Sequence, residues 1–414
     1  MVIQKIRHIY LEYPRNFWVV IGALFIDHLG GALIFPFIAL FITAKFGVGM
    51  TAVGQLLAVL AIASIFGSTF GGAMTDKFGR KVTIVSGLIF SAISALALGL
   101  AEDLKVIFLA CGVVGLFSNV GGPAQQAMIA DLLPENKRAD GFGLLRVMAN
   151  LAVTIGPAIG GILATHSYLW LFLIDAVAST VTALTVFFAV PETKPEAPPD
   201  RPDESMIQTL KGYFTVSRDG LFMAFIFASI LMTLVYMQMN STLSVYLRDV
   251  HGVPDQGFGY ILSLNAGMVV LFQFWITRRI KNLPPMIVMA MGTLLFALGF
   301  LMYGFVSTYV LFMLAMVIIT IGEMLVVPIS QALVANLAPE DMRGRYMAIY
   351  GFSWTIPLAV GPLAAGLIMD NYDPNWVWYF CALVSMIAIA SYLFLHFNAR
   401  ERLSKMNQIP KVGM

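Results

Sequence analysis

The sequence predicts an all-α membrane protein whose twelve transmembrane helices form two parallel-repeat six-helix bundles around a central cavity. Three observations support this fold class. Of the 414 residues, 59% are hydrophobic and only 12% are charged, and the mean hydropathy is +0.84, which excludes a soluble globular protein. Long apolar stretches follow one another along the whole chain, and the second half repeats the pattern of the first.

The apolar stretches give the number of helices, because about 20 apolar residues are needed to cross a bilayer as a helix. They predict spans at 17–43, 51–75, 82–101, 105–132, 141–165, 168–190, 220–248, 256–277, 285–306, 308–337, 344–369 and 376–397. Proline and charge dominate the segment after the sixth span, which is typical of a solvated linker. We therefore expect an N-terminal bundle at 1–190, a cytoplasmic linker at 191–219, and a C-terminal bundle with a short cytoplasmic tail at 220–414.

Positive charge predicts the orientation, because cytoplasmic loops retain Lys and Arg. With the N-terminus inside, all but four of the 25 Lys and Arg residues fall in cytoplasmic segments. The exceptions are Lys45, Lys105 and Arg248, which fall outside, and Arg146, which falls within a span. Both termini are therefore expected in the cytoplasm, in a multi-pass protein of the plasma (inner) membrane.

An internal repeat appears when the chain is shifted against itself by 205 residues without a gap. The shift aligns Pro134-Glu135 with Pro339-Glu340, Gly156-Pro157 with Gly361-Pro362, and Gly161 with Gly366. Chance similarity between apolar helices would not keep proline and glutamate in register. Because each repeat holds an even number of helices, the two halves have the same orientation, as in transporters built from parallel repeats.

A charged segment between the second and third spans, residues 72–81, is termed the gate loop here. Gly79 allows the chain to reverse, because glycine takes a positive φ without steric cost. Asp131 ends the fourth span on the same side and is close enough in topology to pair with Arg80. We hypothesise a cytoplasmic gate made of Gly72, Asp76, Lys77, Gly79, Arg80, Lys81 and Asp131. The alternative is a set of solvated charges that only fix the topology.

Twelve spans, two parallel repeats, a charged linker and the gate loop together resemble the major facilitator superfamily over essentially the whole chain. The segment Gly156-Pro157 with Gly160-Gly161 is similar to the Gly-Pro motif of its twelve-helix drug/proton antiporters, the multidrug exporter group. This resemblance implies secondary active transport by alternating access. The span at 105–132 lacks the buried Arg that many such antiporters carry, and the charges of the gate loop are not repeated in the second half.

Ionisable residues inside a bilayer are costly and therefore mark candidate functional positions. They are Asp27, His28, Arg146, Asp175 and Glu323, and we assign them to proton coupling or substrate binding. A carboxyl that is neutral when buried and ionised when the cavity fills with water can carry a proton. The alternatives are a structural hydrogen bond for Glu323, a permanent pair with His28 or a nearby backbone group for Asp27, and a polar clamp for Asp175. Arg146 could serve an anionic partner or neutralise a nearby aspartate.

Polar side chains within the spans are candidates for lining the cavity. They are Asn119, Gln126, Asn150, Tyr236, Gln238, Asn240, Asn265 and Gln331. In the seventh span they alternate with methionines, and such a mixed lining suits adaptable recognition. The alternative is that these side chains pack against lipid or against other helices.

Proton-coupled export of amphipathic or cationic small molecules is the function we expect, with proton-coupled uptake of a small metabolite as the alternative. An intramembrane enzyme or a receptor is a remote alternative, because no catalytic or metal-ligand spacing and no large extramembrane domain is evident. We expect no enzymatic activity, no metal and no cofactor. The expected partners are a small-molecule substrate, protons and membrane lipids, without nucleic acid, for a monomeric protein.

Overall fold

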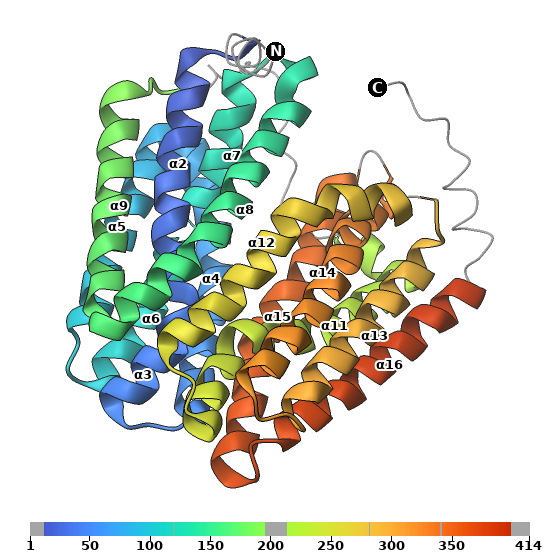
Figure 1. The fold of residues 1–414 in the computed structure, drawn as a ribbon. Helices are drawn as coiled ribbons and strands as arrows, with labels where there is room; N and C mark the ends of the chain where they lie inside the picture. The colour runs from blue at the N-terminus through green and yellow to red at the C-terminus, as the bar shows by residue number, and fades with distance from the viewer. Residues whose placement is uncertain (1–11, 119, 195–212, 281, 340–341, 399–414) are drawn as a thin grey trace, which may run out of the picture. The chain divides into compact units, whose positions relative to one another are not determined.

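The computed structural model describes residues 12–118, 120–194, 213–280, 282–339 and 342–398. Within these ranges the chain is helical, with no strand, and it contains twelve helices long and apolar enough to cross a membrane (Figure 1). This confirms the predicted all-α membrane fold. Most of the predicted linker, residues 195–212, lies outside the described residues.

The first six spans follow the predicted stretches closely. They are formed by α2 (Arg15–Ile34) with η1 (Phe35–Phe37) and α3 (Ile38–Phe46), α4 (Met50–Phe78), α5 (Arg80–Leu100), α6 (Leu104–Ser118) with α7 (Gly121–Leu132), α8 (Glu135–His166) and α9 (Leu169–Ala189). Pro36 accounts for the break in the first span, because proline lacks the N–H of an α-helical bond and the turn tightens to a 3-10 helix.

The last six spans are each one continuous helix. They are α11 (Gly220–His251), α12 (Asp255–Ile280), α13 (Pro285–Tyr303), α14 (Tyr309–Leu337), α15 (Arg343–Asn371) and α16 (Trp376–Asn398). Asp219 starts α11, because its side chain accepts from the N–H of Phe222. Gly252 ends it with a φ of +66°, a left-handed cap that glycine adopts without strain.

Two compact units hold the described residues. The first comprises those of Met1–Val48, Gln55–Pro199 and Val253–Ser263, and the second those of Gly49–Gly54, Asp200–Gly252 and Leu264–Met414. Each unit thus consists of one sequence half, except that the starts of α4 and α12 belong to the unit of the other half. The division of the chain at 1–190, 191–219 and 220–414 stays a prediction.

Inside the first unit, α2 packs against α8 and α9, and α5 packs against α6, α7 and α9 (Figure 1). Phe17, Leu24, Ile84, Met128 and Val186 belong to its buried apolar core. Inside the second unit, α13 packs against α14 and α16, and α11 packs against α15 and α16. The helices that carry the embedded acids, α2, α9 and α14, are therefore each held by close neighbours.

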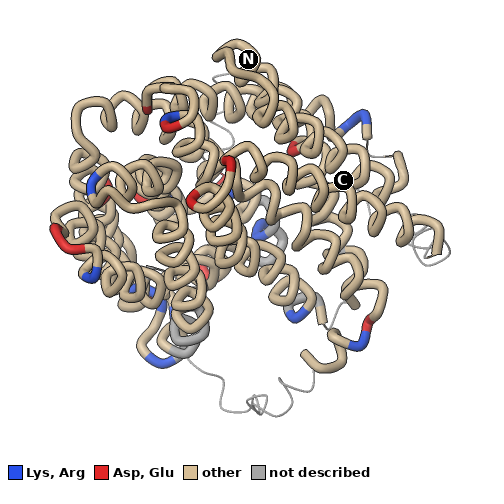
Figure 2. The backbone as a smooth tube through the Cα atoms, turned by 90° about the horizontal axis from the view of Figure 1, so that it is seen from below, with Lys and Arg blue, Asp and Glu red and all other residues tan. Residues whose placement is uncertain are grey.

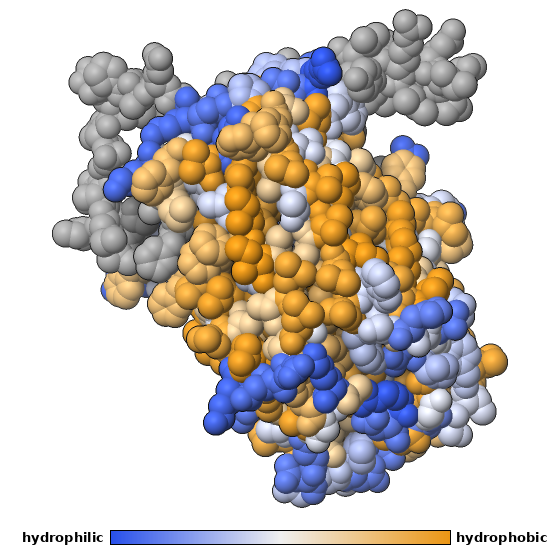
Figure 3. All heavy atoms as spheres, turned by 90° about the vertical axis from the view of Figure 1, so that its left-hand side faces the viewer, coloured by the Kyte–Doolittle hydropathy of each residue, from blue (hydrophilic) through white to orange (hydrophobic). Residues whose placement is uncertain are grey.

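The outer surface is apolar where the spans would meet lipid. Val177, Leu184 and Phe188 on α9 are exposed, and Figure 3 shows a hydrophobic band on this side of the molecule between more hydrophilic ends. Figure 2 shows how few charged residues the spans carry. Such a surface is stable only in a hydrocarbon environment, so the chain is an integral membrane protein.

Candidate functional site

Glu323 lies in the middle of α14, and both of its carboxylate oxygens are hydrogen-bonded. The Tyr236 hydroxyl donates to Oε1 over 3.0 Å, and the Asn265 amide donates to Oε2 over 2.7 Å. No Lys or Arg forms a salt bridge with it among the described residues. A half-buried carboxyl whose partners are all neutral is free to exist in either protonation state.

The partners of Glu323 suit a change of protonation. A tyrosine hydroxyl both donates and accepts, so it can bond to the carboxylate or to the protonated acid. The Asn265 amide is held in place by Thr320, whose Oγ1 lies 3.0 Å from Nδ2 and in turn donates to the Met316 carbonyl. A proton can therefore be added at Oε1 without leaving any of these groups unpaired.

Close helix packing surrounds Glu323. A Cβ on its neighbour Gly322 would lie 2.6 Å from the Gly292 carbonyl oxygen, so α13 and α14 meet backbone to backbone. Tyr236 packs edge-on against Trp354, with ring centroids 5.9 Å apart. The half-buried acid therefore lies beside closely packed helices.

Asp27 forms the second acid site, in the first unit. The Ser179 hydroxyl of α9 donates to Asp27 Oδ1 over 2.8 Å. His28 Nδ1 lies 2.8 Å from the Leu24 carbonyl oxygen, and His28 interacts with Asp27 electrostatically. The alternative that Asp27 pairs permanently with His28 or a nearby backbone group stays a prediction.

Asp175 lies one turn before Ser179 on α9 and is 7% exposed. It interacts electrostatically with Asp27, and a Cβ on Gly30 would lie 2.5 Å from its Oδ1. The two carboxylates line one cavity of about 320 Å³ together with Ser91, Ser94 and apolar side chains. The sequence predicted both acids as candidates but not their convergence on one cavity.

The other predicted polar residues are spread over both units. Gln238 is buried on α11, where its amide donates to the Leu234 carbonyl and its oxygen accepts from Thr242 over 2.6 Å. Asn240 and Gln331 are half-buried, whereas Gln126 and Asn150 are exposed, and Asn119 lies outside the described residues. Among the described members of this predicted set, Tyr236 and Asn265 are the ones that hydrogen-bond to an embedded acid.

Arg146 is exposed on α8 and forms no ion pair with Asp27 or Asp131 among the described residues. The idea that it neutralises one of these aspartates is therefore wrong in this conformation. Binding of an anionic partner stays a prediction for this residue.

The expectation of a loop at 72–81 is wrong, because α4 continues to Phe78 and α5 begins at Arg80, so only Gly79 lies between the two helices. Arg80 and Asp131 pair at this place, as the topology suggested. Arg80 Nε lies 2.9 Å from Asp131 Oδ2, and the two side chains are 14% and 19% exposed. Gly79 has a φ of +96°, which explains the glycine at this reversal. Lys77 is exposed and Lys81 is half-buried, whereas the Asp76 side chain and the surroundings of Gly72 lie outside what the structure describes. The gating role stays a prediction.

Glu192, in the predicted linker, is a member of this network that sequence reasoning missed. Its carboxylate accepts from the backbone N–H groups of Arg80 and Lys81 over 2.9 and 3.1 Å, which caps the start of α5. Partial burial raises the pKa of Glu192, but bonds from the backbone N–H groups of Arg80, Lys194, Thr193 and Lys81 outweigh this and lower it below its usual value. An acid directly after the sixth span was the available signal.

The Gly-Pro motif of α8 permits close approach within the first unit. A Cβ on Gly156 would lie 2.5 Å from the Ala32 Cβ, and one on Gly160 would lie 2.8 Å from the Leu33 carbonyl oxygen. A Cβ on Gly161 would lie 3.1 Å from the Cα of Gly259, near the start of α12. Pro157 lies inside the continuous helix. These contacts account for the small residues of the motif by packing, whereas a role in preventing leak stays a prediction.

The repeated motif on α15 makes the corresponding contacts in the second unit. A Cβ on Gly366 would lie 2.5 Å from the backbone of Met50, at the start of α4. Asp370, one turn further along, accepts from the backbone N–H groups of Met50 and Thr51 over 2.9 and 2.8 Å. Asp370 was also missed from the sequence, because a helix cap between segments about 320 residues apart leaves no local pattern.

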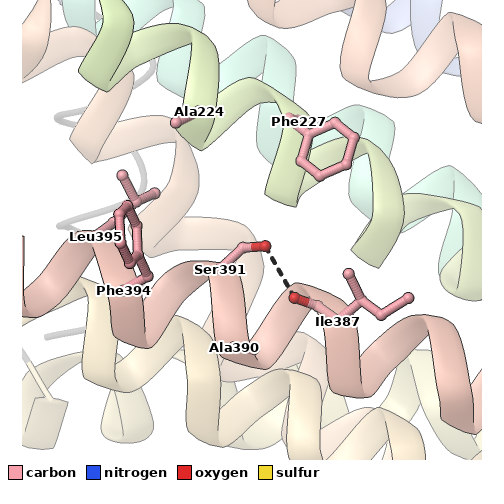
Figure 4. Close-up of a pocket in the computed structure, with 7 residues that line it drawn as sticks. All are labelled: Ala224, Phe227, Ile387, Ala390, Ser391, Phe394 and Leu395. Carbon is pink, nitrogen blue, oxygen red and sulfur yellow. Dashed lines mark hydrogen bonds between the residues drawn. The ribbon is translucent and has the colours of Figure 1, made fainter.

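A groove of about 400 Å³ lies between α11 and α16 in the second unit (Figure 4). Apolar side chains such as Phe227 and Phe394 line it. Ser391 also lines the groove, and its hydroxyl donates to the Ile387 carbonyl over 2.8 Å. The groove therefore offers no charged group to a solute and fits a lipid-facing surface.

Comparison with known families gives a match over most of the chain. The family model described as Major Facilitator Superfamily matches residues 20–359 and 256–411. The "Na(+), Li(+), K(+)/H(+) antiporter" of Planococcus maritimus is 29% identical over 411 residues, which cover 93% of this chain and 96% of that protein. The "Multidrug resistance protein MdtH" of Shigella flexneri is 23% identical over 90% of this chain and 92% of its own length.

Solved structures of similar fold include the nucleoside transporter NupG, with a TM-score of 0.77 and 15% identity over 92% of this chain and 100% of that one. The peptide transporter POT in complex with sulfate has a TM-score of 0.75 and 15% identity over 95% of this chain and 96% of that one. At such low identity these structures show a shared fold only.

Proposed function

This chain belongs to the Major Facilitator Superfamily, and we propose that it is a proton-coupled antiporter that exports cationic or amphipathic small molecules by alternating access. It is a secondary transporter by family. The cargo, the coupling to protons and the direction of transport are the parts proposed here.

The observation that carries the proposal is the environment of Glu323. Its carboxyl lies within a membrane span and is bonded to a tyrosine hydroxyl and an amide, with no basic partner among the described residues. An intramembrane acid of this kind is suited to receive and release a proton. The Tyr236 hydroxyl can bond to both forms, so loading a proton does not disrupt the site.

The cationic cargo is supported by the second acid site and by the relatives. Asp27 and Asp175 place two carboxylates on one cavity without a Lys or Arg in its lining, and such a site favours a cation over an anion. One relative is named as a cation/proton antiporter and another as a multidrug resistance protein. Uptake of a small metabolite is the competing scheme.

Alternating access requires contacts that form and break on each side of the membrane. We assign the Arg80–Asp131 ion pair with Glu192 to the side predicted to be cytoplasmic. The asymmetry of Lys and Arg supports both termini in the cytoplasm and a location in the plasma membrane. A monomer is the proposed state, because each unit has its own buried core. Enzymatic activity and a cofactor are not part of the proposal.

Purified protein in proteoliposomes tests the proposal. With a pH-sensitive dye trapped inside and an inwardly directed supply of tetraphenylphosphonium, wild-type protein should move protons against the flow of the organic cation. Glu323→Gln should retain the fold and lose the proton flux, because a glutamine at this position cannot be ionised.

A matched control is Glu102→Gln, an exposed acid in the loop before α6, which should transport like the wild type. Reversing the imposed proton gradient should reverse the net flux of the organic cation. Flux that does not respond to this reversal would disprove proton coupling, and proton-driven entry of a metabolite without organic cation exchange would favour the uptake scheme.

A further inference from the structure

The cavity beside Asp27 and Asp175 has a property that the Glu323 site lacks, namely space around its acids. It measures about 320 Å³ and is lined by residues of α2, η1, α3, α4, α5, α6 and α9 of the first unit. At about 30 Å³ per molecule of liquid water, it has room for an ion with several waters. The Ser179 hydroxyl donates to Asp27 Oδ1 only, so Oδ2 accepts no hydrogen bond from the described residues.

Two further polar groups face this space without a partner in the described part of the chain. Asp175 is 7% and Ser94 is 4% exposed, and both line the cavity. Neither side chain forms a hydrogen bond with another described residue. Buried polar groups are normally satisfied, and the exceptions call for a ligand or water. A buried carboxylate and a buried hydroxyl on one cavity therefore indicate that something polar occupies it.

The chemistry of these groups selects the occupant. Every polar side chain in the lining offers oxygen, from the carboxylates Asp27 and Asp175 and the hydroxyls Ser91 and Ser94. Oxygen donors favour hard cations such as the alkali metals. No group of three or more His, Cys, Asp or Glu suited to a metal occurs among the described residues. Two carboxylates with hydroxyls and water suit a weakly held monovalent ion better than a tightly held divalent one.

We propose that the Asp27–Asp175 cavity binds an alkali-metal cation as cargo, in exchange for a proton on the same two carboxylates. Two ionised acids in contact repel each other, so a cation and a proton are alternative ways to reduce their charge. The titratable groups at this place are Asp27, Asp175 and the neighbouring His28. The inference rests on the proposed antiport, and it adds a cargo and a place for it.

Ion binding at equilibrium tests the inference without transport. Purified wild-type protein should melt about 2 °C higher in NaCl or LiCl than in choline chloride at equal ionic strength, once the ion reaches about ten times its half-saturating concentration. Lowering the pH from 8 to 6 should weaken this response, because protons compete for the carboxylates. Asp175→Asn should lose it, and Ser94→Ala should need several-fold more NaCl.

Asp249→Asn is the control, because Asp249 is an exposed acid whose side chain is 51% accessible; it should respond like the wild type. Stabilisation of Asp175→Asn and Ser94→Ala by NaCl as strong as that of the wild type would overturn the inference. Stabilisation by tetraphenylphosphonium alone would also overturn it, in favour of an organic cation in this cavity.

Proteoliposomes separate this inference from the antiport proposal. Proton release driven by an organic cation but not by NaCl, LiCl or KCl would leave the antiporter intact and remove the alkali cargo. Binding of NaCl without proton movement for any cation would support the alkali-cation site and disprove proton-coupled antiport. Proton release that is driven by NaCl in the wild type and abolished by Asp175→Asn is the expected result.

Discussion

The two units each hold embedded carboxyl groups, but they surround them differently. Glu323 in the second unit has both oxygens bonded and lies beside helices that meet backbone to backbone. In the first unit, Asp27 accepts from one hydroxyl, that of Ser179, and both Asp27 and Asp175 line a cavity of about 320 Å³. An acid whose two oxygens are bonded by neighbouring side chains is suited to exchange a proton, whereas an acid pair that lines a cavity also has space for a larger cation.

Moving each acid by one methylene group should give the largest difference between the two sites. Glu323→Asp withdraws the carboxyl by about 1.5 Å and breaks its bonds to Tyr236 and Asn265. At about 1.5 to 3 kcal/mol for each bond to a charged group, we expect at least a hundredfold loss of proton-coupled flux. Asp175→Glu extends into free space and should cost less than about tenfold. Initial rates of proton movement in proteoliposomes measure both losses. Equal losses would remove the distinction between the fully hydrogen-bonded Glu323 site and the Asp27–Asp175 cavity.

A methyl group added beside each site probes the packing. The Cβ of Gly322→Ala would lie 2.6 Å from the Gly292 carbonyl oxygen, whereas that of Gly31→Ala would meet nothing within 4 Å. Gly322→Ala should therefore lower the free energy of unfolding by about 1 to 3 kcal/mol. Gly31→Ala should leave it unchanged or raise it slightly, because alanine favours the helix. Unfolding of both variants in the same detergent tests this, and a large loss for Gly31→Ala would contradict the open cavity.

Removing one hydrogen-bond donor should lower the transport rate more at the Glu323 site than at the Asp27–Asp175 cavity. Tyr236→Phe leaves Glu323 Oε1 without its 3.0 Å partner, so flux should fall about tenfold. Ser179→Ala removes the 2.8 Å bond to Asp27, but water in the cavity can substitute, and the loss should stay below about threefold. Transport rates at several pH values measure both, and a greater loss for Ser179→Ala would reverse the comparison.

The smallest effect concerns the starts of two repeated helices, α5 and α13. Glu192 caps α5, whereas α13 starts at Pro284 without a side-chain cap. Because the folded pKa of Glu192 lies below its ordinary value of 4.5, the ionised form stabilises the fold. This contribution is complete above that ordinary value and is lost as the pH falls through the lowered folded value.

Glu192→Gln should therefore lower the melting temperature slightly at pH 7 and should make it less sensitive to acid between about pH 5 and 3. Thermal unfolding of the wild type, of this variant and of the exposed-acid control Glu102→Gln measures the difference. A variant that loses stability on acidification as steeply as the wild type would rule out this role for Glu192.

The membrane fold could be predicted from the sequence because its causes are local and repeated. The need for about 20 apolar residues in a span gave twelve helices with ends close to those observed. Gly79 and Pro36 show the same point on a smaller scale, since backbone conformation follows from the residue itself. The cost of charge in lipid likewise identified Asp27, Asp175 and Glu323 as candidates without any coordinates.

Only the tertiary structure decided how these residues combine. Ser179 and Asp27 are 152 positions apart, and Tyr236 and Glu323 are 87 positions apart, so no sequence pattern links either pair. Glu192 and Asp370 cap helices that begin far from them in the chain. The sequence by itself determined that the chain spans a membrane and which few acids lie inside it. Packing of distant helices decided which acid has both oxygens hydrogen-bonded and which acids line a cavity, because the reach of a side chain depends on the positions of whole helices.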